Sequence, residues 1–200
     1  MTREVVLVPG LWMPAAAMQL LGRRLAAAGY GVGCFAYAGR ASFDENLRRL
    51  CAFLDGRSAH LIGHSLGGVL ILEALRDPAV RASSALLLGA PVRGCMAGRR
   101  LGSHPAGRWM MGQCSALWHE RDARWHRAEP LGVIAGTAPV GLGRLLGPLP
   151  DASDGVVRVD ETEVEGAAAR ALLPLGHSML IFSRRVAALA GRFMREGRFE

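Results

Sequence analysis

Residues 59–76 read Ala-His-Leu-Ile-Gly-His-Ser-Leu-Gly-Gly-Val-Leu-Ile-Leu-Glu-Ala-Leu-Arg, a short apolar run followed by a longer one. Residues 59–63 predict a buried strand, and residues 66–76 predict a nearly all-apolar, buried helix. Ser65 lies at the joint. A serine on so tight a turn has a strained backbone, so small residues are needed two positions before and after it. Gly63 and Gly67 fill those positions, which predicts a hydroxyl presented at the carboxyl end of a parallel sheet.

The rest of the chain alternates short apolar runs with helical patterns, which indicates an α/β protein: a mostly parallel central sheet with helices on both faces. At 200 residues we expect a single domain, residues 1–200. Strands are predicted at residues 4–8, 31–37, 59–63, 84–88, 131–136 and 168–173. Helices are predicted at residues 14–28, 66–76 and 178–195, and a further helix is predicted to begin at a capping box formed by Ser42 and Glu45. Residues 92–130 lose the alternation, and we expect them to form a lid-like insertion.

Charge and composition exclude several classes of function. All 24 basic residues are arginine, so lysine Schiff-base chemistry is excluded, and the formal net charge is +7. The arginines are scattered in ones and twos without interleaved aromatics, which favours solvated helix faces over a nucleic-acid surface. Attraction of anionic substrates or carriers is the weaker interpretation. No apolar run reaches the roughly 20 residues of a membrane span, and no export signal is evident, so we expect a cytoplasmic protein without a transmembrane segment.

A serine nucleophile needs a base to take its proton and a carboxylate to orient that base. On a fold with this strand-to-helix turn, the expected order along the chain is serine, acid, histidine. His177 follows the last predicted strand and immediately precedes the last predicted helix, which is where the base is expected. The other histidines precede the serine or lie in the insertion: His60, His64, His104, His119 and His126.

Three aspartates lie between the penultimate predicted strand and His177. Asp154 stands in Ser-Asp-Gly-Val-Val, a turn in which glycine lets the chain bend back and leaves the carboxylate free. We therefore choose Asp154 as the acid, with Asp151 as its main rival. Asp160 is more typical of a surface charge.

Two backbone amides are candidates to stabilise an oxyanion. The Leu66 amide lies at the start of the predicted helix, where the helix dipole favours negative charge. The Leu11 amide follows Pro9-Gly10 in the loop after the first strand, and Gly10 permits close approach of the backbone to a substrate. A simple strand-to-helix turn would also explain Pro9-Gly10.

Four segments together resemble the α/β-hydrolase superfamily, particularly its small bacterial serine esterases and lipase-like members: residues 8–12, 63–68, 153–157 and 176–178. The resemblance implies a reduced α/β-hydrolase fold, hydrolysis of an acyl bond through an acyl-enzyme on Ser65, Asp154 and His177, and no metal or organic cofactor. Two departures stand out. Many relatives carry His-Gly where this chain has Pro9-Gly10, and the chain lacks the first strands of larger members.

Several apolar residues predict a wall for an acyl chain, or equally the core by which the insertion packs on the sheet. They are Trp12, Trp109, Met110, Met111, Leu117, Trp118 and Trp125.

Three functions therefore stay open. The first is an ester hydrolase acting on a small-molecule ester with a hydrophobic acyl group. The second is an acyl-thioesterase or acyltransferase with the same triad, which a basic surface attracting an acidic acyl-carrier protein would favour. The third is a non-catalytic binding protein. Such a protein would be expected to have lost the nucleophile or the base, whereas this sequence contains candidates for both.

Overall fold

A computed structural model describes residues 3–39, 41–111, 118–119, 123–140, 147, 149–150 and 152–200. Six parallel strands form one sheet in the order β2-β1-β3-β4-β5-β6. Their bounds are β1 Glu4–Val8, β2 Gly31–Cys34, β3 Ala59–His64, β4 Ala82–Leu88, β5 Leu131–Gly136 and β6 Ala169–Leu173. Because every strand runs the same way, all carboxyl ends meet at one edge of the sheet.

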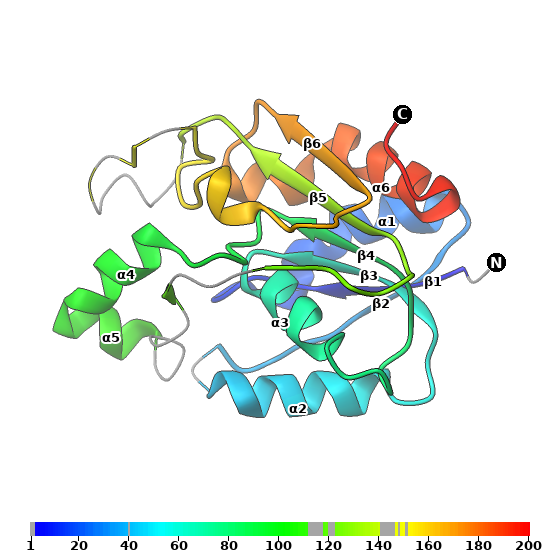
Figure 1. Cartoon of the computed structure of the whole chain (residues 1–200), viewed down its shortest axis with the longest axis horizontal. Helices are drawn as coiled ribbons and strands as arrows, with labels where there is room; N and C mark the ends of the chain where they lie inside the picture. The colour runs from blue at the N-terminus through cyan, green and yellow to red at the C-terminus, as the bar shows by residue number, and fades with distance from the viewer. Residues whose placement is uncertain are drawn as a thin grey trace.

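Helices cover both faces of the sheet, which confirms the predicted fold class (Figure 1). Helices α1 (Gln19–Ala27) and α6 (Arg184–Glu196) lie on one face, and α2 (Phe43–Leu54) and α3 (Leu66–Ala74) lie on the other. Each layer has its own apolar core, one containing Leu21 and Phe193 and the other Leu50 and Leu70, all fully buried. Burial of side chains of this size contributes about 1.5–3 kcal/mol each, so the two cores fix the sheet between its helices.

The strand order reverses next to β1, since β2 lies on one side of it and β3 on the other. In open parallel sheets, ligands bind outside the carboxyl ends of the strands at such a reversal, because the loops there diverge to opposite faces and leave a crevice. Ser65 directly follows β3, and the loop containing Gly10 follows β1. The topology thus brings two of the predicted site segments to the point where a ligand crevice is expected.

Several element boundaries differ from those predicted. Strand β2 ends at Cys34 rather than residue 37. The first helix starts with a 3-10 turn, η1 (Ala15–Met18), before α1. The last helix is also split: a 3-10 segment, η5 (His177–Phe182), precedes α6, because Ser183 caps α6 by accepting a hydrogen bond from the Val186 amide. The predicted cap of α2 is confirmed, with the Ser42 hydroxyl accepting a 3.1 Å hydrogen bond from the Glu45 amide.

Between β4 and β5 the chain forms α4 (Met96–Ser103) and α5 (Pro105–Met111), which lie beyond the carboxyl ends of the strands (Figure 1). Glu161 connects this insertion to the segment after Asp154. Its carboxylate accepts hydrogen bonds from the Met96 amide at 2.6 Å and the Arg158 amide at 2.9 Å, and burial raises its pKa. The start of α4 is therefore attached to the loop that supplies the predicted acid. Over the described residues, no helix is long and apolar enough to cross a membrane.

Candidate active site

Ser65 sits on a strained turn between β3 and α3, with φ 51° and ψ −123°. Such a conformation costs a non-glycine residue on the order of 1–3 kcal/mol and persists only where its surroundings impose it. The flanking glycines are part of those surroundings. A Cβ on Gly63 would lie 2.5 Å from Gly68, and one on Gly67 would overlap the Val8 and Pro9 carbonyl oxygens. The turn can therefore form only because both positions are glycine.

Asp154 is buried in the loop after β5, with 1% of its surface exposed. Its Oδ1 accepts hydrogen bonds from the Val156 amide at 3.0 Å and the Val157 amide at 2.7 Å. Gly155 has φ 89°, so it supplies the bend that the sequence predicted. These two amides fix the carboxylate group and leave Oδ2 to another partner.

That partner is His177, whose Nδ1 lies 2.7 Å from Asp154 Oδ2. The backbone is paired as well, because the His177 amide donates to the Asp154 carbonyl at 2.9 Å. An imidazole that donates from Nδ1 to a carboxylate carries its lone pair on Nε2. The structure thus brings the predicted acid and base together and leaves Nε2 as the nitrogen able to take a proton.

Two glycines at the ends of adjacent strands make room for this pair. A Cβ on Gly89, which follows β4 with φ 54°, would lie 3.0 Å from Asp154 Oδ2 and 3.3 Å from His177 Nδ1. A Cβ on Gly136, at the end of β5, would lie 2.7 Å from the Asp154 Cβ. Sequence reasoning did not assign either glycine to the site, although each ends an apolar run.

His64, which the order along the chain excludes as the base, contacts the site directly. Its Nε2 lies 3.1 Å from the His177 carbonyl oxygen, and the two imidazole centroids are 4.6 Å apart. Only a ring nitrogen can donate to a carbonyl, so Nε2 carries the hydrogen. Nδ1 is buried and has no hydrogen-bond partner among the described residues. The residue next to Ser65 therefore holds the backbone of His177.

Burial, together with repulsion from His177, lowers the pKa of His64 from 6.5 to about 3. In the unfolded chain His64 takes up a proton as the pH falls below 6.5, whereas folded His64 stays neutral down to about pH 3. As the pH is lowered from 6.5 to about 3, the free energy of unfolding therefore falls by up to about 1.4 kcal/mol per pH unit. Above pH 6.5, His64 is neutral in both states and causes no such loss of stability.

We expect His64→Gln to weaken this dependence, because an amide can donate in place of Nε2 but does not titrate. Between pH 7 and pH 5 the natural protein should lose about 2 kcal/mol more stability than the variant. Urea unfolding at both pH values measures the difference. Equal losses in the two proteins would contradict the assignment of a neutral, buried His64.

The loop after β1 packs against the nucleophile turn. A Cβ on Gly10 would lie 3.0 Å from His64 Nδ1 and 3.1 Å from the Ser65 Cβ. The Tyr37 hydroxyl holds this loop by donating to the Pro9 carbonyl at 2.9 Å. Within the described residues, neither the Leu11 amide nor the Leu66 amide has an acceptor. Both amides thus remain able to donate to a ligand.

The residues of the predicted apolar wall divide into two groups. Trp12, Trp109 and Met110 are exposed by 49%, 67% and 44%, and the Trp12 indole donates to the Met110 carbonyl at 3.1 Å. This hydrogen bond joins the loop of Gly10 to the insertion. Trp118 is only 5% exposed and packs on Gly98, so it belongs to the core of the insertion. Of the others, Met111 is buried, Trp125 is half-buried, and Leu117 lies outside the described residues.

The remaining candidates lie away from the site or cannot be placed. Asp160 is exposed and pairs with Arg158, whose Nε donates to it at 2.9 Å; this pairing lowers the pKa of Asp160. Asp151 lies outside the described residues. His60 is buried against the Ser84 hydroxyl, while His104, His119 and His126 are exposed. Among the described residues, no group of three His, Cys, Asp or Glu could hold a metal ion.

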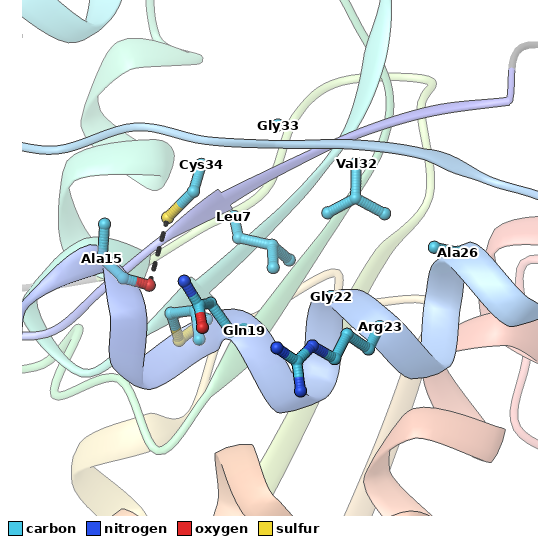
Figure 2. Close-up of a pocket in the computed structure, with 10 residues that line it drawn as sticks. Leu7, Ala15, Gln19, Gly22, Arg23, Ala26, Val32, Gly33 and Cys34 are labelled. Atoms are coloured by element: carbon cyan, nitrogen blue, oxygen red, sulfur yellow. Dashed lines mark hydrogen bonds between the residues drawn. The ribbon is translucent and has the colours of Figure 1, made fainter.

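An open groove of about 370 Å³ lies between α1 and β2 (Figure 2). Leu7 and Val32 point into it, and Gln19 and Arg23 project from α1 beside it. The groove is open because β2 is the edge strand of the sheet. Its lining contains none of the three residues of the predicted triad, so it is separate from the candidate active site.

No protein-family model matches the chain, and no curated protein matches it in sequence. Solved structures do match it. The mature lipase BlEst2 of Bacillus licheniformis superposes with a TM-score of 0.76 at 16% identity, covering 98% of this chain and 92% of that one. A thermophilic esterase from Thermogutta terrifontis gives a TM-score of 0.63 at 16% identity, with 97% and 90% covered.

An extracellular α/β-hydrolase from a Paenibacillus species gives a TM-score of 0.58 at 15% identity, with 97% and 98% covered. Identities this low establish a common fold and not a common substrate. The resemblance stated from the motifs is confirmed at this level: the chain has the α/β-hydrolase fold.

Proposed function

We propose that the protein is a serine hydrolase that cleaves carboxylic esters through an acyl-enzyme. The observations that carry the proposal are the buried pair of Asp154 and His177, hydrogen-bonded at 2.7 Å, and a serine on a strained turn whose neighbour His64 contacts His177. A buried carboxylate that orients a histidine is the arrangement that activates a serine hydroxyl. Names of the similar structures, which include a lipase and an esterase, agree with this chemistry.

The proposed reaction has two stages. Ser65 Oγ attacks the acyl carbon while His177 Nε2 takes the hydroxyl proton, and the Leu11 and Leu66 amides stabilise the oxyanion. The C–O bond to the leaving alcohol breaks as His177 returns the proton to the alcohol oxygen. Water then attacks the acyl-enzyme, His177 takes a proton from the water and gives it to Ser65 Oγ, and the carboxylic acid leaves.

A hydrophobic acyl group is the substrate that the surroundings favour. Trp12 and Met110 are joined by a hydrogen bond, and both keep apolar surface exposed where the loop of Gly10 meets the insertion. Aromatic and thioether side chains suit an alkyl chain because they offer apolar, adaptable surface. We propose that the insertion contributes to binding the acyl chain in this way.

A panel of substrates tests the proposal. We expect hydrolysis of p-nitrophenyl esters with a preference for longer over short acyl chains, and slower turnover of acyl-thioesters with the same chains. A preference for thioesters would replace the proposal with an acyl-thioesterase or acyltransferase that uses the same residues. Absence of turnover with every ester and thioester, in protein shown to be folded by circular dichroism, would favour the non-catalytic binding protein.

A further inference from the structure

The positive charge of the protein is concentrated in two segments. Residues 5–43 and 166–195 contain eight arginines and no aspartate or glutamate, whereas the rest of the chain contains 16 arginines and 17 acidic residues. The two segments include α1, η5 and α6, which contact one another on one side of the sheet. Folding therefore joins charges that look scattered along the sequence.

Four arginines define this basic face: Arg23, Arg24, Arg184 and Arg185. The Arg24 guanidinium donates to the Phe182 carbonyl at 2.6 Å, which fixes α1 against the segment that leads into Arg184. Over the part of the chain that the structure describes, none of the four forms an ion pair with a carboxylate. Their charge is thus not neutralised within the described protein.

The position of Arg184 and Arg185 works against helix stability. Both lie in the first turn of α6, which contains no acidic residue. The helix dipole disfavours positive charge at this end and favours it at the other. Charges that oppose the stability of their own helix are expected where they serve an interaction instead.

Apolar side chains are exposed on the same elements. Leu20 on α1 is 39% exposed, and Met179 and Phe182 on η5 are 52% and 38% exposed. Because η5 begins at His177, this apolar surface adjoins the candidate active site. Arginines beside exposed apolar residues match the chemistry of an anionic membrane surface, which offers headgroup phosphates next to acyl chains.

We propose that the basic face docks the protein on membranes that contain anionic lipids. The four arginines bind headgroup phosphates, and Leu20, Met179 and Phe182 enter the interfacial region. A soluble polyanion such as duplex DNA would use the arginines but not the apolar side chains. The proposal does not rest on the proposed function, since docking needs no catalytic residue.

Vesicle sedimentation with the full-length Ser65→Ala protein tests the docking without catalysis. We expect strong binding to vesicles of equimolar phosphatidylcholine and phosphatidylglycerol, weak binding to phosphatidylcholine alone, and loss of binding as salt is raised. The triple variant R23Q/R184Q/R185Q should partition about a hundredfold less, from about fivefold per charge. Exposed Arg48, Arg49 and Arg81 lie outside this face, so R48Q/R49Q/R81Q is the control with the same net charge.

Four outcomes would overturn the proposal. An equal loss in both triple variants would show that only net charge matters. Equal binding to neutral and anionic vesicles would remove the role of the arginines. If M179S/F182S leaves vesicle binding unchanged, the apolar side chains take no part in docking. If an acidic carrier protein or duplex DNA binds where anionic vesicles do not, the face recognises a soluble polyanion.

Discussion

Replacing Ser65 with alanine is expected to lower kcat/KM for a p-nitrophenyl ester by about 10⁵-fold or more, because the variant lacks the oxygen proposed to attack the acyl carbon. The fold should persist. Ser65 forms no side-chain hydrogen bond with the described residues, and its backbone bonds, including the 2.9 Å bond from its amide to the Leu88 carbonyl, do not involve Oγ. Initial rates measure the loss, and the thermal midpoint by circular dichroism should change by only a few degrees.

Ser58→Ala is the matched control. Ser58 is exposed and precedes β3, so it lies at the end of the same strand opposite to Ser65. This variant should keep the natural activity. Substantial turnover by folded Ser65→Ala protein would show that the nucleophile lies elsewhere.

Asp154→Asn should lower kcat by about 10³–10⁴-fold. The two Asp154 oxygens have different partners: Oδ1 accepts from two backbone amides, and Oδ2 accepts from His177 Nδ1. In asparagine, the oxygen will stay with the two amides, so the NH₂ group must face His177. An NH₂ group there requires Nδ1 to accept, which moves the ring hydrogen to Nε2. His177 then has no lone pair with which to take the Ser65 proton.

Asp160→Asn makes the same chemical change at an exposed carboxylate nearby and should leave kcat within about twofold, as expected for surface substitutions. The rate of acylation under single-turnover conditions separates the effect of the tautomer from an effect on binding. If Asp151→Asn causes the large loss and Asp154→Asn does not, Asp151 is the acid and the role assigned to Asp154 is wrong.

The sequence predicted those features that short segments specify. The strand and helix around Ser65 follow from apolar runs and three glycines within six residues, and the bend at Asp154 follows from Gly155. The parallel sheet follows from the alternation of elements, and the similar solved structures confirm the fold. Each of these signals is local, so one sequence is enough to read it.

What the sequence did not predict depends on contacts between distant residues. Gly89 and Gly136 end different strands, and only the sheet brings them both to Asp154. His64 was excluded as a base, yet the fold places its ring against His177. The basic face was missed for the same reason, because α1 and α6 meet only after the chain has folded around the sheet.

Labelling of the folded protein with a fluorophosphonate, followed by peptide mass spectrometry, tests most directly whether Ser65 is an activated nucleophile. We expect one phosphonyl adduct on the peptide that contains Ser65, with activity lost in step with labelling. Asp154→Asn protein should label much more slowly. No adduct on folded protein under conditions that label a benchmark esterase, or an adduct on another serine, would contradict the role proposed for Ser65.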